Sequence, residues 1–288
     1  DEFGWDGGSF AYPLDIDLLW DTDSKDLWVG SAAISFDEDD DMYVVNTVYN
    51  DWTRGDRWLF HSEAYEDGYV VFGTEQKVMD EVNDLEGGDD TGSFNTSPYV
   101  SCTPDGECIV GLVGLFLGAD GDASNVSNNH TGIFRLSDDH GASWYGCTSG
   151  GVANGCAPST DGYGYYFIPD ETWDDLIAAQ FSEGYYDHCT MTQADTNDFW
   201  SYYEDDMKVD AEGNPHFLIQ VLPCDDEFCY YDGNAGLYHF TADKDDLGTP
   251  GAWSWSFVID GAATYNFTDL TGDTYIWNSS CTLSFSAE

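Results

Sequence analysis

One pattern recurs along this chain and limits what it can fold into: a short apolar segment, an acidic or glycine-containing turn, and a second apolar segment. It begins at Ser31, Ser97 and Met207, and its opening half returns at Ser279. β-Branched and aromatic residues on both sides of Asp, Gly or Pro turns are typical of β-hairpins. The repetition therefore predicts an all-β chain built from several similar hairpins.

A second pair of predicted strands follows each of the first three hairpins. These pairs begin at Arg57, Thr131 and Gly236. Four strands in a unit of about fifty residues is the size of a β-propeller blade. We therefore predict a single β-propeller domain over residues 1–288, with roughly five to seven four-stranded blades. An irregular β-sandwich, which also uses many short strands, is the alternative.

The stretch around residues 150–200 fits the pattern least, and we expect an irregular or helical insertion there. Within it, residues 171–181 have the composition of a short helix inserted in a loop. The sequence also stops inside a predicted blade. Either the N-terminal segment completes that blade by ring closure, or the natural chain extends beyond Glu288.

The eight cysteines indicate structural disulfides. Six of them form pairs that are close in sequence, which leaves the remaining two as a long-range pair. No spacing is a C-x-x-C redox or zinc pattern, so we expect an oxidising compartment, extracellular or at the cell surface. The predicted pairs are Cys102–Cys108, Cys147–Cys156, Cys224–Cys229 and Cys189–Cys281.

Five N-glycosylation sequons agree with that compartment. The chain has no apolar run long enough to span a bilayer, so we expect no direct insertion into a membrane. It also has no signal peptide, and it is typical of a mature chain whose leader has been removed. The candidate glycosylated residues are Asn95, Asn125, Asn129, Asn266 and Asn278.

The formal charge of −49, with only seven Lys and Arg, excludes a basic surface for phosphates, and hence nucleic-acid binding. Such a surface needs cations, because self-repulsion opposes the compact state. Bound Ca²⁺, a high-salt habitat and an acidic coat for solubility are three open explanations. Clustered Asp carboxylates are the ligands that Ca²⁺ prefers. The candidate calcium ligands are Asp21, Asp23, Asp26, Asp37, Asp39, Asp41, Asp120 and Asp122.

The segment SDDHGASW from Ser137 to Trp144 matches the pattern S-x-D-x-G-x-[ST]-[WF]. At this point the chain resembles the Asp-box β-propellers, a superfamily that includes sialidases and sortilin-type receptors. The resemblance implies a tight turn between the outer two strands of a blade. In that turn His140 is expected to face solvent. The structural positions of the motif are Ser137, Asp139, Gly141, Ser143 and Trp144.

The roles of these residues follow from the resemblance. Asp139 would accept backbone hydrogen bonds, Gly141 would adopt a positive φ, and Trp144 would pack between blades. The motif is structural in its family and confers no activity by itself.

Sialidase chemistry resembles a site with three arginines that clamp a carboxylate. This chain has only Arg54, Arg57 and Arg135. Two of them share one loop, and we place Arg135 at the outer edge of a blade, so they cannot readily converge. We therefore predict a non-sialidase member and assign no catalytic residue.

The prediction for function is an extracellular, disulfide-stabilised acidic propeller that acts as a surface scaffold or binding module. It would contact glycans or neighbouring surface proteins, or self-assemble as a subunit of a cell-surface layer or filament. A polysaccharide-active hydrolase or lyase, which needs only two carboxylates, is one alternative. A receptor-type module for a soluble ligand is the other.

Overall fold

The fold is that of a computed structural model, which describes most of the central part of the chain. Within the described residues the chain is mostly β-strand, with a single α-helix. The described residues are 27–51, 57–66, 69–79, 97–115, 130–157, 164–180, 185–187, 192–194, 198–224, 235–260, 267–268 and 274–275.

Sheet 1 is an antiparallel sheet in which consecutive strands are neighbours, in the order β1-β2-β3-β4, with β5 also paired to β3. The β1–β2 hairpin is the first of the predicted hairpins. The strands are β1 (Leu27–Asp37), β2 (Met42–Asp51), β3 (Arg57–Glu66), β4 (Tyr69–Phe72) and β5 (Gln76–Met79).

Sheet 2 has the order β6-β7-β8-β10-β9 and contains the second predicted hairpin, β6–β7. We predicted its fourth strand directly after the Asp-box, but there only Tyr145 pairs with Leu136. The chain then enters the loop closed by Cys147–Cys156 and returns as β10 beside β8. The strands are β6 (Tyr99–Cys102), β7 (Cys108–Leu115), β8 (His130–Ser137), β9 (Cys156–Ala157) and β10 (Tyr165–Phe167).

Sheet 3 has the order β13-β14-β15-β16 and contains the third predicted hairpin, β13–β14. Two short antiparallel hairpins, β11–β12 and β17–β18, lie outside the three sheets. The sheet 3 strands are β13 (Asp198–Val209), β14 (Pro215–Cys224), β15 (Gly236–Ala242) and β16 (Trp253–Asp260). The short hairpins comprise β11 (Tyr185–Asp187), β12 (Thr192–Ala194), β17 (Phe267–Thr268) and β18 (Thr274–Tyr275).

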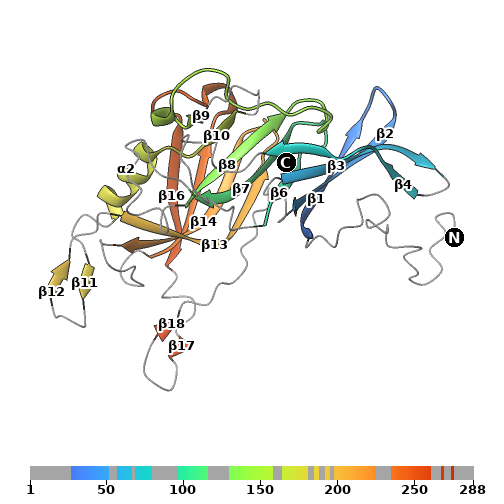
Figure 1. The fold of residues 1–288 in the computed structure, drawn as a ribbon. Helices are drawn as coiled ribbons and strands as arrows, with labels where there is room; N and C mark the ends of the chain where they lie inside the picture. The colour runs from blue at the N-terminus through green and yellow to red at the C-terminus, as the bar shows by residue number, and fades with distance from the viewer. Residues whose placement is uncertain are drawn as a thin grey trace.

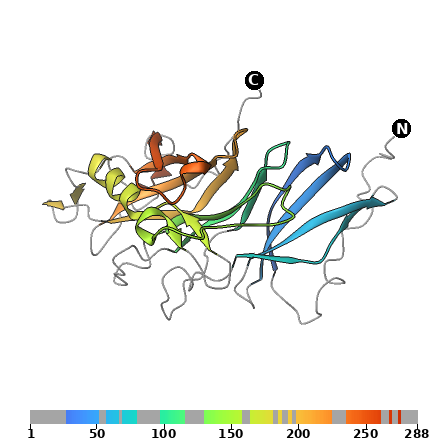
Figure 2. The same ribbon diagram turned by 90° about the horizontal axis from the view of Figure 1, so that it is seen from above.

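The first strand of each sheet lies beside the first strand of the next. Sheet 2 lies between sheets 1 and 3 (Figures 1 and 2), and β6 neighbours both β1 and β13. Two serine hydroxyls join these strands. Ser31 Oγ in β1 accepts a 2.7 Å hydrogen bond from the Val100 amide, and Ser101 Oγ in β6 accepts a 3.2 Å bond from the Val209 amide.

Two apolar cores hold the sheets together, because each strand presents alternate side chains to opposite faces. The core between sheets 1 and 2 includes Ala33, Val48, Leu59, Val100, Val110, Leu112 and Ile133. The core between sheets 2 and 3 includes Ile109, Val113, Phe134, Met207, Phe217, Ile219, Tyr238 and Phe240.

The predicted helix is present as α2 (Asp170–Gln180), with two carboxylates in its first turn, where they favour the helix dipole. We predicted an insertion in a loop, but the helix also contributes side chains to the core. Trp173 and Leu176 are buried in the core between sheets 2 and 3, and Trp173 Nε1 donates to Thr131 Oγ1 at 3.0 Å. Two 3₁₀ turns, η3 (Val152–Asn154) and η4 (Lys244–Asp246), complete the helical elements of the described residues.

The predicted all-β class is confirmed. The described sheets are antiparallel, and none of them closes into a barrel. The prediction that Arg135 lies at the outer edge of a blade is wrong. Its strand β8 lies between β7 and β10, so its side chain is buried and donates to the carbonyls of Gly164 and Val78, each at 2.9 Å.

Candidate functional site

The Asp-box residues form one compact turn directly after β8. Ser137 Oγ accepts from the Gly141 amide at 2.8 Å and donates to Asp139 Oδ1 at 2.8 Å. Asp139 also accepts from the Ser143 amide at 2.8 Å and from Ser143 Oγ at 2.5 Å. Gly141 has a φ of 86°, which a residue with a Cβ rarely adopts.

The electrostatics of Asp139 follow from these contacts. Burial alone would raise the pKa of its carboxyl. The hydrogen bonds from Ser143 and Ser137, together with the nearby His61, outweigh burial, so the pKa lies below its ordinary value. Asp139 is therefore an ionised, fully engaged turn residue.

The end of the turn returns to the sheet. Tyr145 exchanges two backbone hydrogen bonds with Leu136, at 2.8 and 2.9 Å. Trp144 packs against the core between sheets 1 and 2. The structure thus brings all five Asp-box residues together at the junction of two sheets.

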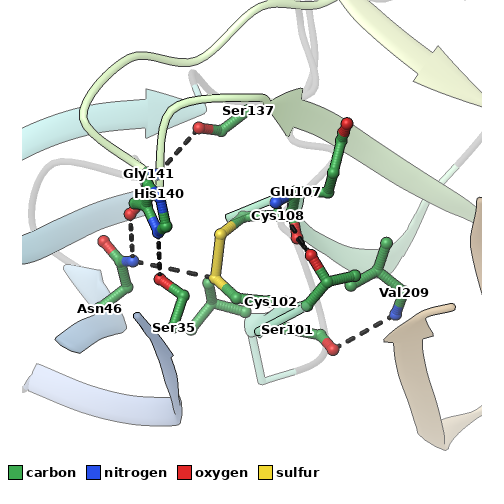
Figure 3. Close-up of a disulfide and its surroundings, with 12 residues drawn as sticks. Ser35, Asn46, Ser101, Cys102, Glu107, Cys108, Ser137, His140, Gly141 and Val209 are labelled. Atoms are coloured by element: carbon green, nitrogen blue, oxygen red, sulfur yellow. Dashed lines mark hydrogen bonds between the residues drawn. A yellow bond between two sulfur atoms is a disulfide. The ribbon is translucent and has the colours of Figure 1, made fainter. Parts of the chain in front are cut away.

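We predicted that His140 faces solvent, but its ring is turned toward sheet 1. Its Nδ1 lies 2.8 Å from Ser35 Oγ in β1, and its carbonyl accepts from Asn46 Nδ2 in β2 at 2.7 Å (Figure 3). The ring can lie there because Gly106 has no side chain: a Cβ at Gly106 would come within 2.6 Å of the imidazole. The variable position of the motif therefore links sheet 2 to sheet 1.

His61 extends this junction. Its Nδ1 lies 3.0 Å from Asn46 Oδ1. Because Asn46 Nδ2 donates to His140, the amide oxygen faces His61, and His61 Nδ1 is the donor. Burial lowers the pKa of His61, and the charges of Asp139 and Glu63 offset only part of that effect.

The Cys102–Cys108 disulfide lies against the same junction (Figure 3). The two cysteines face each other across the β6–β7 hairpin, and Asn46 Nδ2 lies 3.8 Å from Cys102 Sγ. Cys147–Cys156 is also present, so the structure confirms two of the four predicted disulfides.

A second polar cluster, not predicted from the sequence, lies on sheet 3. His216 Nε2 is 3.0 Å from Asp210 Oδ2, and His216 Nδ1 is 2.7 Å from His239 Nε2. Since the carboxylate can only accept, His216 donates from Nε2 and accepts at Nδ1 from His239. Asp210, His216 and His239 thus form one directed chain of hydrogen bonds.

The protonation equilibria of this chain have distinct causes. Burial lowers the pKa of His239, and the neighbouring His216 lowers it further. For Asp210, burial acts to raise the pKa, but hydrogen bonds from His216 and Asn214 outweigh it and hold the pKa below its ordinary value. The chain is arranged around an ionised aspartate and a neutral His239.

Lys244 links sheet 3 to sheet 2 as His140 links sheet 2 to sheet 1. Its backbone amide donates a 3.0 Å hydrogen bond to Asn214 Oδ1, and Asn214 lies in the turn between β13 and β14 of the same sheet. Its Nζ donates a 2.7 Å hydrogen bond to Glu107 Oε1, and Glu107 lies in the turn between β6 and β7 of sheet 2. Both linking residues lie in the turn that follows the third strand of their sheet.

The acidic turn between β1 and β2 is the one candidate calcium loop that the structure describes. Asp37 Oδ1 accepts from the amides of Asp39 and Asp40, at 2.9 and 3.3 Å, so that carboxylate stabilises the turn. Asp39 and Asp41 are exposed. In the described part of the chain, no three His, Cys, Asp or Glu side chains are grouped so that they could hold a metal ion.

The remaining predicted sites lie outside the described residues or depend on residues there. They are the calcium candidates Asp21, Asp23, Asp26, Asp120 and Asp122, the pairs Cys224–Cys229 and Cys189–Cys281, and the sequons at Asn95, Asn125, Asn129, Asn266 and Asn278.

The outer face of sheet 1, turned away from sheet 2, exposes apolar side chains. Ile34 is 61% exposed and Tyr43 is 60% exposed. Ile34 pairs with Val45 across β1 and β2, and Tyr43 pairs with Phe36, whose ring centre is 4.9 Å from its own. The acidic turn of residues 37–41 closes the end of this hairpin.

Comparisons with known proteins do not assign the chain to a family. No protein-family model matches the chain, and no curated protein is detectably similar to it in sequence. Among the described residues, no helix is both long and apolar enough to cross a membrane.

Proposed function

We propose that this chain is an extracellular Asp-box β-propeller that acts as a non-catalytic surface scaffold, and that a second copy of the chain packs on the outer face of sheet 1. Two observations support the propeller. Three successive sheets run in chain order from first to fourth strand, and their first strands β1, β6 and β13 lie side by side. The Asp-box turn follows the third strand of its sheet, where the family resemblance implies it.

The observation that carries the scaffold function is the exposed apolar face of sheet 1. Ile34, Tyr43 and their neighbours are apolar residues of the kind that protein interfaces bury. The two disulfides stiffen the body that carries this face and favour an oxidising, extracellular location.

Charge decides the conditions of assembly. Two copies with a formal charge of −49 repel each other, and the acidic turn of residues 37–41 lies beside the contact face. Association therefore requires salt or divalent cations to reduce the repulsion. This requirement fits a surface layer or filament that forms only in a cation-rich exterior.

Sedimentation velocity tests the proposal. The wild type is expected to be monomeric in EDTA at low salt and to associate in CaCl₂ or concentrated NaCl. The double variant Ile34→Ser/Tyr43→Ser should stay monomeric throughout. Val258→Ser is the matched control, because Val258 is 52% exposed but lies on sheet 3.

Two sedimentation results would remove the proposed packing of a second copy on sheet 1. One is a wild type that remains monomeric in every condition, and the other is a double variant that associates as well as the wild type. Turnover of any member of a polysaccharide panel would replace the non-catalytic scaffold with the enzyme alternative. An experimental structure whose strands do not radiate around one axis would exclude the propeller.

A further inference from the structure

Asp205 is a carboxylate placed in an apolar core. In β13 it pairs with Ile219 of β14, and Met207, two residues later, pairs with Phe217. Directly paired residues share a face of the sheet. Ile219, Met207 and Phe217 belong to the core between sheets 2 and 3, so the Asp205 side chain lies on that core face.

The carboxylate of Asp205 has no partner among the other described residues. The residue is 5% exposed, and neither of its oxygens has a hydrogen-bond partner on another described residue. Burying an ionised carboxylate without compensation is among the most costly arrangements in a protein core. Burial and the adjacent Asp206 raise the pKa of Asp205 well above its ordinary value, and the backbone amide of Asp205 itself offsets only part of that effect. A group of this kind calls for a bound ion or proton.

The backbone directly before Asp205 is irregular. The register moves from Ser201 opposite Val221 to Asp205 opposite Ile219, so four steps along β13 correspond to two along β14. Residues 202–204 consequently have no paired residue in β14, which makes this stretch a bulge. Such bulges are common where a strand serves a site.

We propose that Asp205 and the carbonyl oxygens of this bulge form a buried site for a hard cation, with Ca²⁺ as the probe. Carboxylate and backbone carbonyl oxygens are the ligands of such ions. The site is separate from the acidic surface turns and does not depend on the scaffold function. It would hold the first strand of sheet 3 against sheet 2 by neutralising a charge that the core cannot solvate.

Asp206 provides a matched control for this site. It is the next residue and is also buried, but it pairs with Leu218 and so lies on the opposite face. Its Oδ1 accepts from the Met207 amide at 2.9 Å and lies 3.7 Å from Lys208 Nζ. Asp205→Asn and Asp206→Asn remove the same charge from adjacent positions, and only the first removes the proposed ligand.

Thermal unfolding after EDTA treatment tests the site. In about 1 mM CaCl₂, and compared with MgCl₂ at equal ionic strength, the wild type is expected to melt about 3 °C higher. Asp206→Asn should keep this calcium-specific rise and Asp205→Asn should lose it. Because self-assembly would also respond to calcium, the melts are run on the monomeric Ile34→Ser/Tyr43→Ser background.

Three results would overturn the proposal. The first is an Asp205→Asn variant that keeps the full calcium-specific rise. The second is calorimetric titration of the EDTA-treated protein with CaCl₂, in excess MgCl₂, that detects no calcium-selective site; this measurement needs no variant. The third combines two observations: the wild type shows no calcium response, and its stability falls with rising pH more than that of Asp205→Asn. The carboxyl would then hold a proton instead of a cation.

Discussion

At the scale of single residues, Asp139 and Asp138 are neighbours with different environments. Asp139 accepts three hydrogen bonds within the Asp-box turn, whereas Asp138 is exposed and takes no part in them. We expect Asp139→Ala to lower the free energy of unfolding by about 1–2 kcal/mol. Asp138→Ala should change it by less than about 0.5 kcal/mol. Urea denaturation measures both, and equal effects would contradict the assigned role of Asp139.

His239 predicts a pH dependence of stability with a definite sign. Its pKa is lowered in the folded chain, so between roughly pH 7 and pH 5 the unfolded chain takes up a proton that the folded chain resists. His239 therefore costs stability as the pH falls through this window. We expect His239→Gln to lose less stability than the wild type between these two pH values, measured by urea denaturation at each. Parallel pH profiles would contradict this account.

The turn of the Asp-box was predictable at this scale because the hydrogen bonds that form it are local. Asp139, Gly141 and Ser143 lie within a few residues of one another, and their chemistry defines the turn. The contacts of His140 with Ser35 and Asn46 were not predictable. They depend on how sheet 1 packs against sheet 2, which a motif cannot specify. Asp205 likewise became a candidate only when the register with β14 showed which face it occupies.

At the scale of elements, the approach of Gly146 to Gly164 has a measurable consequence. A Cβ at Gly146 would lie 1.6 Å from the Gly164 carbonyl oxygen, whereas a Cβ at Gly151 would meet nothing within 4 Å. We expect Gly146→Ala to lower the free energy of unfolding by about 2 kcal/mol or more, because backbone must move. Gly151→Ala should have almost no effect. The comparison uses chemical denaturation, and two equally stable variants would show that the clash is relieved without cost.

The hairpins and the helix were predictable as elements. Their sequences combine β-branched and aromatic runs with turn residues, as in the β6–β7 and β13–β14 hairpins, and the segment of α2 has helical composition. The fourth strand of sheet 2 was predicted in the wrong place. We placed that strand directly after the Asp-box turn, but the disulfide-closed loop from Cys147 to Cys156 delays it until β10.

At the scale of the whole molecule, the sequence supported the all-β class but not the arrangement of the sheets. The class follows from the recurring hairpins. The order of the sheets in space depends on long-range contacts such as Ser31 with Val100 and Ser101 with Val209. No periodicity in the sequence marks these serines, because a hydroxyl between strands looks like any other polar residue on an edge.

The net charge of the whole chain predicts a salt response. With 56 acidic and seven basic residues, repulsion acts over the entire surface and is screened by added ions. We expect the melting temperature to rise by roughly 5 °C between about 10 mM and about 1 M NaCl. Circular dichroism melts give the value, and KCl should act like NaCl if screening is the cause. A melting temperature that falls or stays constant would show that the charges are already compensated.

The serine links between first strands also have a consequence for the order of folding. Strand pairs within a sheet join residues that are at most 34 positions apart along the chain, as for Ile133 and Phe167, so each sheet can form with a smaller loop-closure cost than the links between sheets. The links to Val100 and Val209 close loops of 69 and 108 residues and should form last. In pulse-labelled hydrogen exchange, amides inside the three sheets should therefore gain protection before those of Val100 and Val209. The three sheets would then be early kinetic units, and their docking the late step in which a misassembled chain is most exposed to aggregation.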